Sequence, residues 1–254
     1  MIDSKVIPAQ QRTIIADPVL PGYSWNGWSG DTQYLDNPNN KQAIVTMPDT
    51  NITVTSNYNI LWANTVYGAL YNWYSASDSR GFVAGWHLPT YAEFQTLQST
   101  LGGSTVAGGH LKETGTMHWN SPNTGADNSS GFNARAGGQR DFLFSALYQD
   151  AHFWTTTYSF QLFHNSTTIN IVGEYLSVGM SIRLIKDSGT ATEVVIDGVT
   201  YPCVTIGGQC WMAENLKATH YADGSLISEV TDRTAWAALT TGAWCAYNND
   251  HANL

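Results

Sequence analysis

Charged side chains are scarce in this 254-residue chain, and their scarcity excludes several classes of function. Asp, Glu, Lys and Arg make up 12% of the residues, about half the usual share for a soluble domain. Eleven Lys and Arg stand against 20 Asp and Glu, which gives a formal net charge of -9 without any basic run. Because nucleic acids and anionic membranes are bound by clustered positive charge, we expect neither as a partner.

Long apolar runs and cysteines are also few. No apolar stretch reaches roughly 18 residues, the length that spans a bilayer, so we expect no membrane insertion. The first residues lack the basic and apolar regions of a signal peptide. We therefore expect either that a leader has been removed or that the protein leaves its cell by another route, such as phage lysis.

Three cysteines are too few for a disulfide scaffold. If the glycines at 207 and 208 form a two-residue turn, Cys203 and Cys210 do not lie directly opposite each other. A bridge between Cys210 and Cys245 and three free buried thiols both fit the sequence. The cysteines therefore do not indicate a cellular compartment.

Aromatic and small polar residues take the place of the missing charges. The chain has 10 Trp, 13 Tyr and 23 Gly, and it is rich in Asn, Thr and Ser. This composition is typical of a loop-rich protein whose loops are packed by aromatic side chains. It also resembles binding surfaces, where Tyr and Trp supply rigid contact area and Ser, Gly and Asn supply adaptable hydrogen bonds.

Changes in sequence pattern divide the chain into three parts. Residues 1–20 contain two prolines and are predicted to be an extended arm, and residues 21–62 to be a small β-module. Two runs of alternating apolar residues flank Pro48 and Asp49 there, which is a strand–turn–strand signal. Residues 63–254 are predicted to form one larger domain.

Capping and turn signals predict short elements in the larger domain. Thr90 is a natural helix N-cap with Glu93 at the third position, and Gly102 and Gly103 end that helix. A second short helix begins at Thr231 or Asp232. The fold class expected is α+β, with short helices, small antiparallel sheets and long irregular loops.

Several motifs of this domain together resemble the Fibrobacter-type major paralogous domain. They are Trp211-Met-Ala-Glu-Asn-Leu, Gly242-Ala-Trp-Cys-Ala-Tyr-Asn-Asn-Asp, Tyr67-Gly-Ala-Leu-Tyr-Asn-Trp-Tyr, Gly85-Trp-His-Leu-Pro-Thr, the run 118–132 and Ser181-Ile-Arg-Leu-Ile-Lys-Asp. The resemblance implies a C-type-lectin-like fold, shared with formylglycine-generating enzymes. Residues 27–58 are similar to the C-terminal part of an internalin-type B-repeat, a spacer module of surface proteins.

The two halves of the domain stand in the reverse of the family's order. The half expected first occupies residues 189–254, and the half expected last occupies residues 63–188. Three explanations stay open. The domain can be circularly permuted, residues 190–254 can complete a neighbouring subunit as in a homotrimer or other homo-oligomer, or the chain can be cut from a tandem array.

No catalytic constellation is evident in the sequence, and we expect a protein that is not an enzyme and has no cofactor. A formylglycine-generating type of site needs a reactive cysteine pair, but no cysteine lies between residues 67 and 202, and Leu184 stands where the family often has one. The acidic residues are scattered singly, and the seven histidines show no metal-ligand spacing. The oxygen-rich run 120–131 could hold calcium, but Asp127 is its single carboxylate, and a loop of Asx turns is the alternative.

Residues 158–178 depart from the family pattern, whereas the sequences on both sides match it. In lectin-type folds the late strands and loops form the ligand face, and in the variable proteins of diversity-generating retroelements scattered positions of this region change while the scaffold stays fixed. We therefore expect exposed ligand-binding residues in this stretch; the alternative is a pair of half-buried strands in which some of the aromatics are core. The candidates are Tyr158, Phe160, Phe163, His164, Asn165, Asn170, Glu174, Tyr175 and Ser177.

The function expected is non-catalytic extracellular recognition. The partner would be a bacterial surface receptor, protein or glycan, and the location a phage virion or a cell surface. The alternative is a structural virion or assembly protein, or a bacterial adhesin, whose domain mediates oligomerisation.

Overall fold

The computed structural model describes residues 11–15, 23–48, 50–60 and 67–254. The chain divides into two compact units, residues 1–64 and residues 65–254. The described residues are mainly β, with few short helices and several small sheets. In the described part of the chain, no helix has both the length and the apolar character needed to cross a membrane.

Two antiparallel strand pairs make up the described part of the first unit. Strand β1 (Gln11–Ile15) pairs with β3 (Gln42–Thr46), and β2 (Tyr23–Gly30) pairs with β4 (Val54–Ile60). The strands predicted on both sides of Pro48 are therefore present, but each pairs with an earlier strand rather than with the other. Residues 11–15, expected to be part of an extended arm, are one of those partners. The alternation in β3 turns Ala43 and Val45 into a small core with Leu35.

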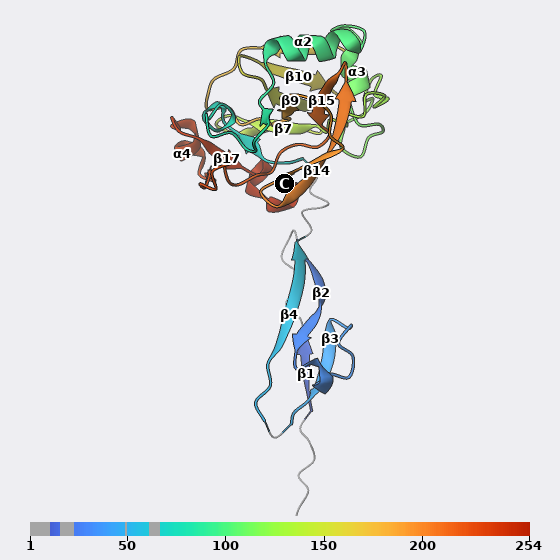
Figure 1. Ribbon diagram of the computed structural model, residues 1–254, viewed down its shortest axis with the longest axis vertical. Helices are drawn as coiled ribbons and strands as arrows, with labels where there is room; N and C mark the ends of the chain where they lie inside the picture. Colours follow the sequence, from blue (N-terminus) through green and yellow to red (C-terminus); the bar gives the residue numbers. More distant parts are fainter. Residues whose placement is uncertain (1–10, 16–22, 49, 61–66) are drawn as a thin grey trace, which may run out of the picture. The chain divides into compact units, whose positions relative to one another are not determined.

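Three small sheets form the second unit (Figure 1). The first sheet has the order β11-β10-β9-β7-β8, the second β13-β14-β15-β12-β6, and the third β16-β17-β5. Their strands are β5 (Leu70–Tyr71), β6 (Trp86–His87), β7 (Gly137–Arg140), β8 (Phe144–Leu147), β9 (Asp150–Trp154), β10 (Ser159–Phe163), β11 (Ile169–Val172), β12 (Ile185–Lys186), β13 (Glu193–Ile196), β14 (Val199–Ile206), β15 (Gln209–Met212), β16 (Ser228–Glu229) and β17 (Ala243–Cys245).

The helices of this unit are short. They are α1 (Trp73–Ala76), α2 (Tyr91–Thr100), α3 (Ala107–Leu111) and α4 (Arg233–Ala237). The predicted capping box of α2 is confirmed, since the Thr90 hydroxyl accepts from the Glu93 N–H at 3.2 Å and the Glu93 carboxylate accepts from the Thr90 N–H at 2.9 Å. Asp232 caps α4 by accepting from the Ala235 N–H.

Helix α2 closes one side of the main core. Its Phe94 and Leu97 are fully buried and belong to a cluster with Phe160 and Leu162 of the first sheet. Figure 1 shows α2 running across this sheet near β10. The elements that carry residues 158–178 are thus fixed from one side by a capped helix.

The two-residue turn at Gly207 and Gly208 is confirmed. Ile206 pairs with Gln209 and Thr205 with Cys210, so Cys203 and Cys210 are offset on the same hairpin. All three cysteines are free thiols. Burial raises the pKa of both the Cys203 and the Cys245 thiol to about 12, so neither is a thiolate at neutral pH.

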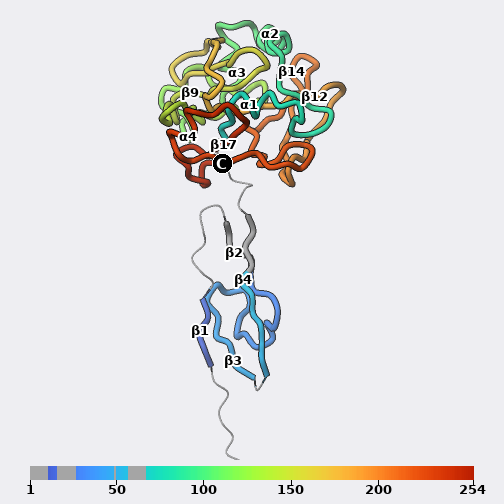
Figure 2. Tube along the Cα trace, turned by 90° about the vertical axis from the view of Figure 1, so that its left-hand side faces the viewer, coloured from blue at the N-terminus to red at the C-terminus, as the bar shows by residue number. Residues whose placement is uncertain are grey.

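Residues 189–254 are built into the same unit as residues 67–188. Strand β15 lies between β14 and β12, and β17 pairs with β5. The Tyr67 N–H donates to the Asn253 carbonyl at 3.2 Å, and Leu254 is buried. Figure 2 shows the C-terminus beside β17. The end of the chain therefore lies next to the start of the other half.

Candidate binding face

The stretch 158–178 forms an antiparallel hairpin followed by a loop. Its strands β10 and β11 pair from Ser159 opposite Val172 to Leu162 opposite Ile169. Residues 164–168 connect the two strands, and residues 173–178 lead from β11 to the next part of the sheet. Because side chains alternate along a strand, the hairpin has an inner face toward α2 and an outer face.

Phe160 lies on the inner face, and its predicted exposure is wrong. It is 1% exposed, and its ring stacks on Phe94 at 4.3 Å and on Phe153 at 4.7 Å between centroids. The strand register turns Phe160 toward the helix together with Leu162, so it stabilises the core and cannot contact a ligand.

The outer face is polar and centres on Gln161. Its amide donates to the Glu174 carboxylate at 2.9 Å, and Asn170 stands opposite it on β11. Burial raises the pKa of Glu174 above its usual value, and the nearby Asp141 carboxylate adds to that rise against the hydrogen bond from Gln161. The hydrogen bond from Gln161 fixes the start of the loop 173–178 to the strand beneath it.

His152 was not among the predicted residues, yet it lies opposite Gln161 on β9. It is 5% exposed, and neither ring nitrogen has a hydrogen-bond partner in the described part of the structure. Burial lowers its pKa to about 4, so the ring is neutral at pH 7. The Asp150 carboxylate lies 3.9 Å from the His152 Nε2 atom, and burial raises the pKa of Asp150. Alternation along Asp150–Trp154 predicts that His152 and Phe153 point to opposite faces of the strand. The residues next to His152 could not be predicted, because they depend on which strands pair.

The most exposed aromatic residues of the stretch gather at one end of the hairpin. Tyr158 is 39% exposed, and its ring contacts that of Tyr91 at 5.4 Å between centroids. Because Ser159 pairs with Val172, the loop that carries Tyr175 and Leu176 begins at this same end. Tyr175 is 79% exposed, and Ser177 is half-buried.

The remaining candidates lie at the other end of β10. Phe163 and His164 are half-buried, Asn165 is exposed, and the His164 ring nitrogen Nδ1 is 3.3 Å from the Gln149 carbonyl. At roughly 3.3 Å per residue, Asn165 is about 20 Å along the chain from Tyr158. The predicted residues outside the core therefore do not form one continuous site. Asn170 and Glu174, beside Gln161, lie between the group at Tyr158 and the group at Phe163.

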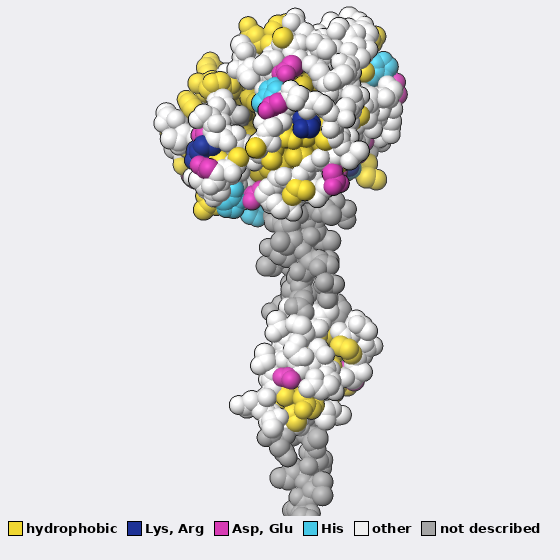
Figure 3. All heavy atoms as spheres, viewed as in Figure 1, with side chains coloured by type: hydrophobic (Ala, Val, Ile, Leu, Met, Phe, Trp, Pro, Cys, Tyr) yellow, Lys and Arg dark blue, Asp and Glu magenta, His cyan; other side chains and the backbone are white. Residues whose placement is uncertain are grey.

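A groove of about 460 Å³ lies close to the Tyr158 end. Trp86, Leu88 and Phe82 supply its apolar lining, and Thr156, two residues before Tyr158, supplies a hydroxyl. No sequence signal could have predicted this groove, because its walls come from three separated segments. On the face of the unit that Figure 3 shows, hydrophobic side chains lie exposed between isolated charged ones.

His87 is held at the edge of this groove by two carboxylates. Its Nδ1 lies 2.6 Å from Asp187, and its Nε2 lies 3.0 Å from Glu93. Burial alone would lower the pKa of His87, but the hydrogen bonds to Asp187 and Glu93 outweigh it and raise the pKa. The ring ties β6 to the start of α2 and to the residue after β12, which is a structural role.

No group of three or more His, Cys, Asp or Glu side chains suited to a metal ion is found among the described residues. In the oxygen-rich run, Asp127 accepts from the Ser129 N–H and from His110. This part of the loop thus forms an Asx turn, whereas the buried Asn123 Oδ1 has no hydrogen-bond partner among the described residues.

The sequence model of the Fibrobacter succinogenes major domain family matches residues 31–186 and 204–254. The chain belongs to this family. No curated protein and no solved structure matches it. The match begins inside the first unit, so the likeness to an internalin-type repeat stays a prediction.

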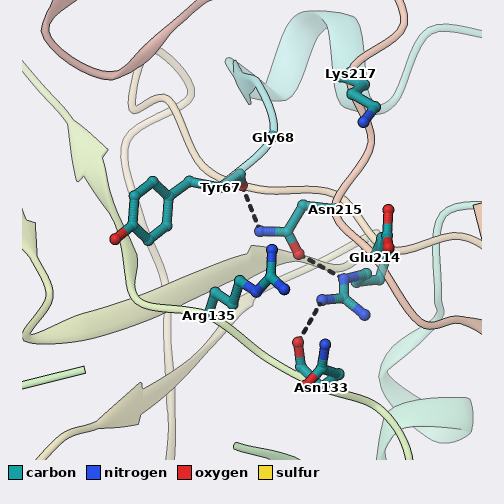
Figure 4. A pocket seen from close by; sticks show the side chains of 8 residues that line it. Tyr67, Gly68, Asn133, Arg135, Glu214, Asn215 and Lys217 are labelled. Carbon is teal, nitrogen blue, oxygen red and sulfur yellow. Dashed lines mark hydrogen bonds between the residues drawn. The ribbon is translucent and has the colours of Figure 1, made fainter. Parts of the chain in front are cut away.

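The two matched segments of this Fibrobacter succinogenes major domain meet around Arg183. Its guanidinium donates to Asn215 Oδ1 at 2.5 Å and to the Phe132 and Met212 carbonyls. Asn215 in turn donates to the Tyr67 carbonyl at 2.7 Å (Figure 4). Burial lowers the pKa of Arg183 to about 9, so it stays charged at pH 7.

The pocket drawn in Figure 4 has a volume of about 10 Å³. A space of this size holds about one water molecule. Residues of both matched segments line it, among them Tyr67 and Arg135 from one and Glu214 and Lys217 from the other. In this domain the pocket is a junction between the two segments and is too small for an organic ligand.

Proposed function

We propose that this chain is a non-catalytic extracellular recognition protein that binds through the Tyr158 end of the β10–β11 hairpin. The observation that carries the proposal is the exposure of Tyr158, whose ring contacts Tyr91, at the end of the hairpin where the loop with the exposed Tyr175 and Leu176 begins. Exposed tyrosines give large contact area at low entropic cost, and they are typical of binding-site anchors.

The ligand proposed is a receptor on a bacterial surface, either a protein or a glycan, and the location is a phage virion or a cell surface. Support comes from the sequence pattern and from the family's implied C-type-lectin-like fold, in which late strands and loops bind ligands. The scarcity of positive charge argues against nucleic acid.

Two further parts of the proposal concern how the domain arose. Circular permutation is supported by the Tyr67–Asn253 hydrogen bond, since a family-order chain would pass directly from one residue to the other. Diversification of Tyr158, Asn165, Asn170 and Tyr175 is supported by their exposure, since side-chain changes at exposed positions leave the core intact. A template repeat and a reverse-transcriptase gene in the neighbouring DNA are the expected signs of it.

The test of recognition is binding to intact bacteria and to a glycan array. Tyr175→Ala combined with Tyr158→Ala should weaken binding about tenfold or more, as loss of an aromatic anchor does. Met117→Ala is the matched control, because Met117 is also 79% exposed but lies outside the hairpin. Unchanged binding by the double variant would exclude this face.

The second candidate is an assembly protein whose domain contacts another copy. The exposed Leu176 beside Tyr175 favours it, because adjacent exposed apolar groups are often covered by a protein partner. Size-exclusion chromatography with light scattering separates the two functions. A stable monomer excludes the assembly function, whereas a trimer that the Tyr175 and Leu176 variants dissociate supports it.

A further inference from the structure

A second hollow, of about 440 Å³, is lined by three segments of the chain. They are the β7–β8 connection with its flanking residues 140–144, residues 231–233 at the start of α4, and residues 248–249 after β17. Its volume falls in the range typical of small-ligand pockets, roughly 300–1,000 Å³. The proposed recognition face uses none of these residues.

Arg140 brings a buried positive charge to this hollow. It is 1% exposed, and its guanidinium lies over the rings of Phe144 and Trp236 at 4.7 and 4.4 Å from their centroids. Its donors reach the Val230 and Thr231 carbonyls at 2.6 and 2.9 Å. Among the described residues no carboxylate pairs with it. A buried cation without a counter-charge favours an anion nearby.

Arg233 brings a second guanidinium, and this one is exposed. It lies 5.1 Å from the centroid of the Phe142 ring, and no hydrogen bond or ion pair engages it within the described part of the chain. The planar fork of an arginine matches a carboxylate with two parallel hydrogen bonds. Asp232, the carboxylate among the described lining residues, already accepts from the Ala235 N–H at 2.8 Å.

The rest of the lining suits the ring and hydroxyl groups of a sugar. Phe142 and Leu143 are 44% and 60% exposed and offer an apolar wall to C–H groups. Asn248 is exposed, and its side chain makes no hydrogen bond in the described structure, while Thr231 adds a hydroxyl. Amides and a hydroxyl beside an aromatic ring are the groups that hold a polyhydroxy ring.

We propose that this hollow binds an acidic sugar, a uronic acid unit, whose carboxylate pairs with Arg233 and whose ring lies against Phe142. An acidic peptide shares the carboxylate but is less well matched, since a sugar also offers hydroxyl groups to the Asn248 amide and ring C–H groups to Phe142. Arg140 and Arg233, two of the 11 basic residues, line this one hollow, although the protein as a whole has a net charge of -9. The inference does not depend on the proposed recognition face.

The test is an NMR titration of the full chain with glucuronate and with galacturonate. Glucose and galactose, which lack the carboxylate, are the controls. The uronates should bind about tenfold more tightly than the neutral sugars, the gain expected from one charge-assisted bidentate contact. Arg233→Gln should remove that preference, and Arg233→Lys should keep only part of it. Arg12→Gln removes one exposed positive charge from the other unit and should change nothing.

Three results would overturn the inference. The first is that the uronates bind no more tightly than the neutral sugars. The second is that neither the uronates nor the neutral sugars bind. The third is that the uronates still bind more tightly than the neutral sugars in Arg233→Gln. A Glu-rich peptide that binds at Arg233 while the uronates do not would assign an acidic protein partner instead. Variants at Tyr158 and Tyr175, which do not line the hollow, should leave this readout unchanged, so it separates failure here from failure of the recognition face.

Discussion

At the scale of single residues, consecutive residues of β10 point into two different environments, an aromatic core and a polar face. Phe160 enters a stack of three aromatic rings, whereas its neighbour Gln161 bonds to Glu174 on the opposite side. His152 lies under this polar side with its ring nitrogens unpartnered among the described residues. A buried imidazole without a partner can be accommodated only while it is neutral, because burial of its charged form is costly.

This residue gives the protein a specific sensitivity to acid. The pKa of His152 is about 4 in the folded protein and about 6.5 in the unfolded chain, so below pH 6.5 the unfolded chain binds the extra proton. Stability is then lost progressively as the pH falls from 6.5 toward 4, by about 2 kcal/mol between pH 7 and pH 5. His152→Gln should remove this loss when the free energy of unfolding is measured at both pH values.

Asp150 and Glu174 act in the opposite direction, because burial raises both carboxyl pKa values and the folded state then binds more protons than the unfolded chain as the pH falls. The comparison is therefore between His152→Gln and the parent protein, both of which keep Asp150 and Glu174. A pH dependence that stays the same in His152→Gln would show that other groups cause it.

At the scale of elements, the candidate face depends on contacts between α2 and its neighbours. The capping box begins the helix, and Gly102 and Gly103, both at positive φ, follow its end. The turn of the β14–β15 hairpin meets the last residue of the helix. A Cβ at Gly207 would collide with the Thr100 hydroxyl, whereas one at Gly208 would meet open space.

Gly207→Ala should therefore destabilise the protein more than Gly208→Ala. Both glycines have positive φ, at 60° and 80°, so both substitutions share a backbone cost of about 1–2 kcal/mol. Only Gly207→Ala adds overpacking against Thr100, which costs about 1–3 kcal/mol more. Urea denaturation measures both, and Thr100→Ala in the Gly207→Ala background should recover the excess. Equal losses in the two single variants would show that the turn is loosely packed on α2.

At the scale of the whole molecule, residues 189–254 are needed to complete the second unit. They supply β13, β14 and β15 of one sheet and two of the three strands in another. Arg183 joins them to the preceding half through Asn215 and the Met212 carbonyl. A buried arginine left without these acceptors is strongly unfavourable, so the halves are expected to be stable only together.

A chain in which residues 189–254 precede residues 65–188 should fold to the same structure. Its unfolding midpoint in denaturant and its near-UV circular dichroism should match those of the second unit in its present order, because the new junction joins Leu254 to residues beside Tyr67. Residues 65–188 alone should show no cooperative transition. If that fragment unfolds cooperatively with native-like stability, the interpretation as exchanged halves is wrong.

Local chemistry made several features predictable from the sequence alone. The capping box at Thr90 and the turn at Gly207 each depend on a few adjacent residues, and both are confirmed. Alternation also predicted strands on both sides of Pro48. Their partners could not be predicted, because pairing depends on residues far away in the chain.

Tertiary structure decided which side chains of 158–178 reach the surface. The sequence by itself determined that this stretch contains aromatic and amide groups and lies inside a segment that the family model matches. From the sequence, Phe160 and Tyr158 are equally plausible ligand-binding residues. Packing against Phe94 buries Phe160, whereas Tyr158 stays exposed close to the groove. Burial of a side chain is a property of the assembled core and is absent from any local pattern. The same holds for His152 and for the hollow at Arg233, whose neighbours come together only in the folded domain.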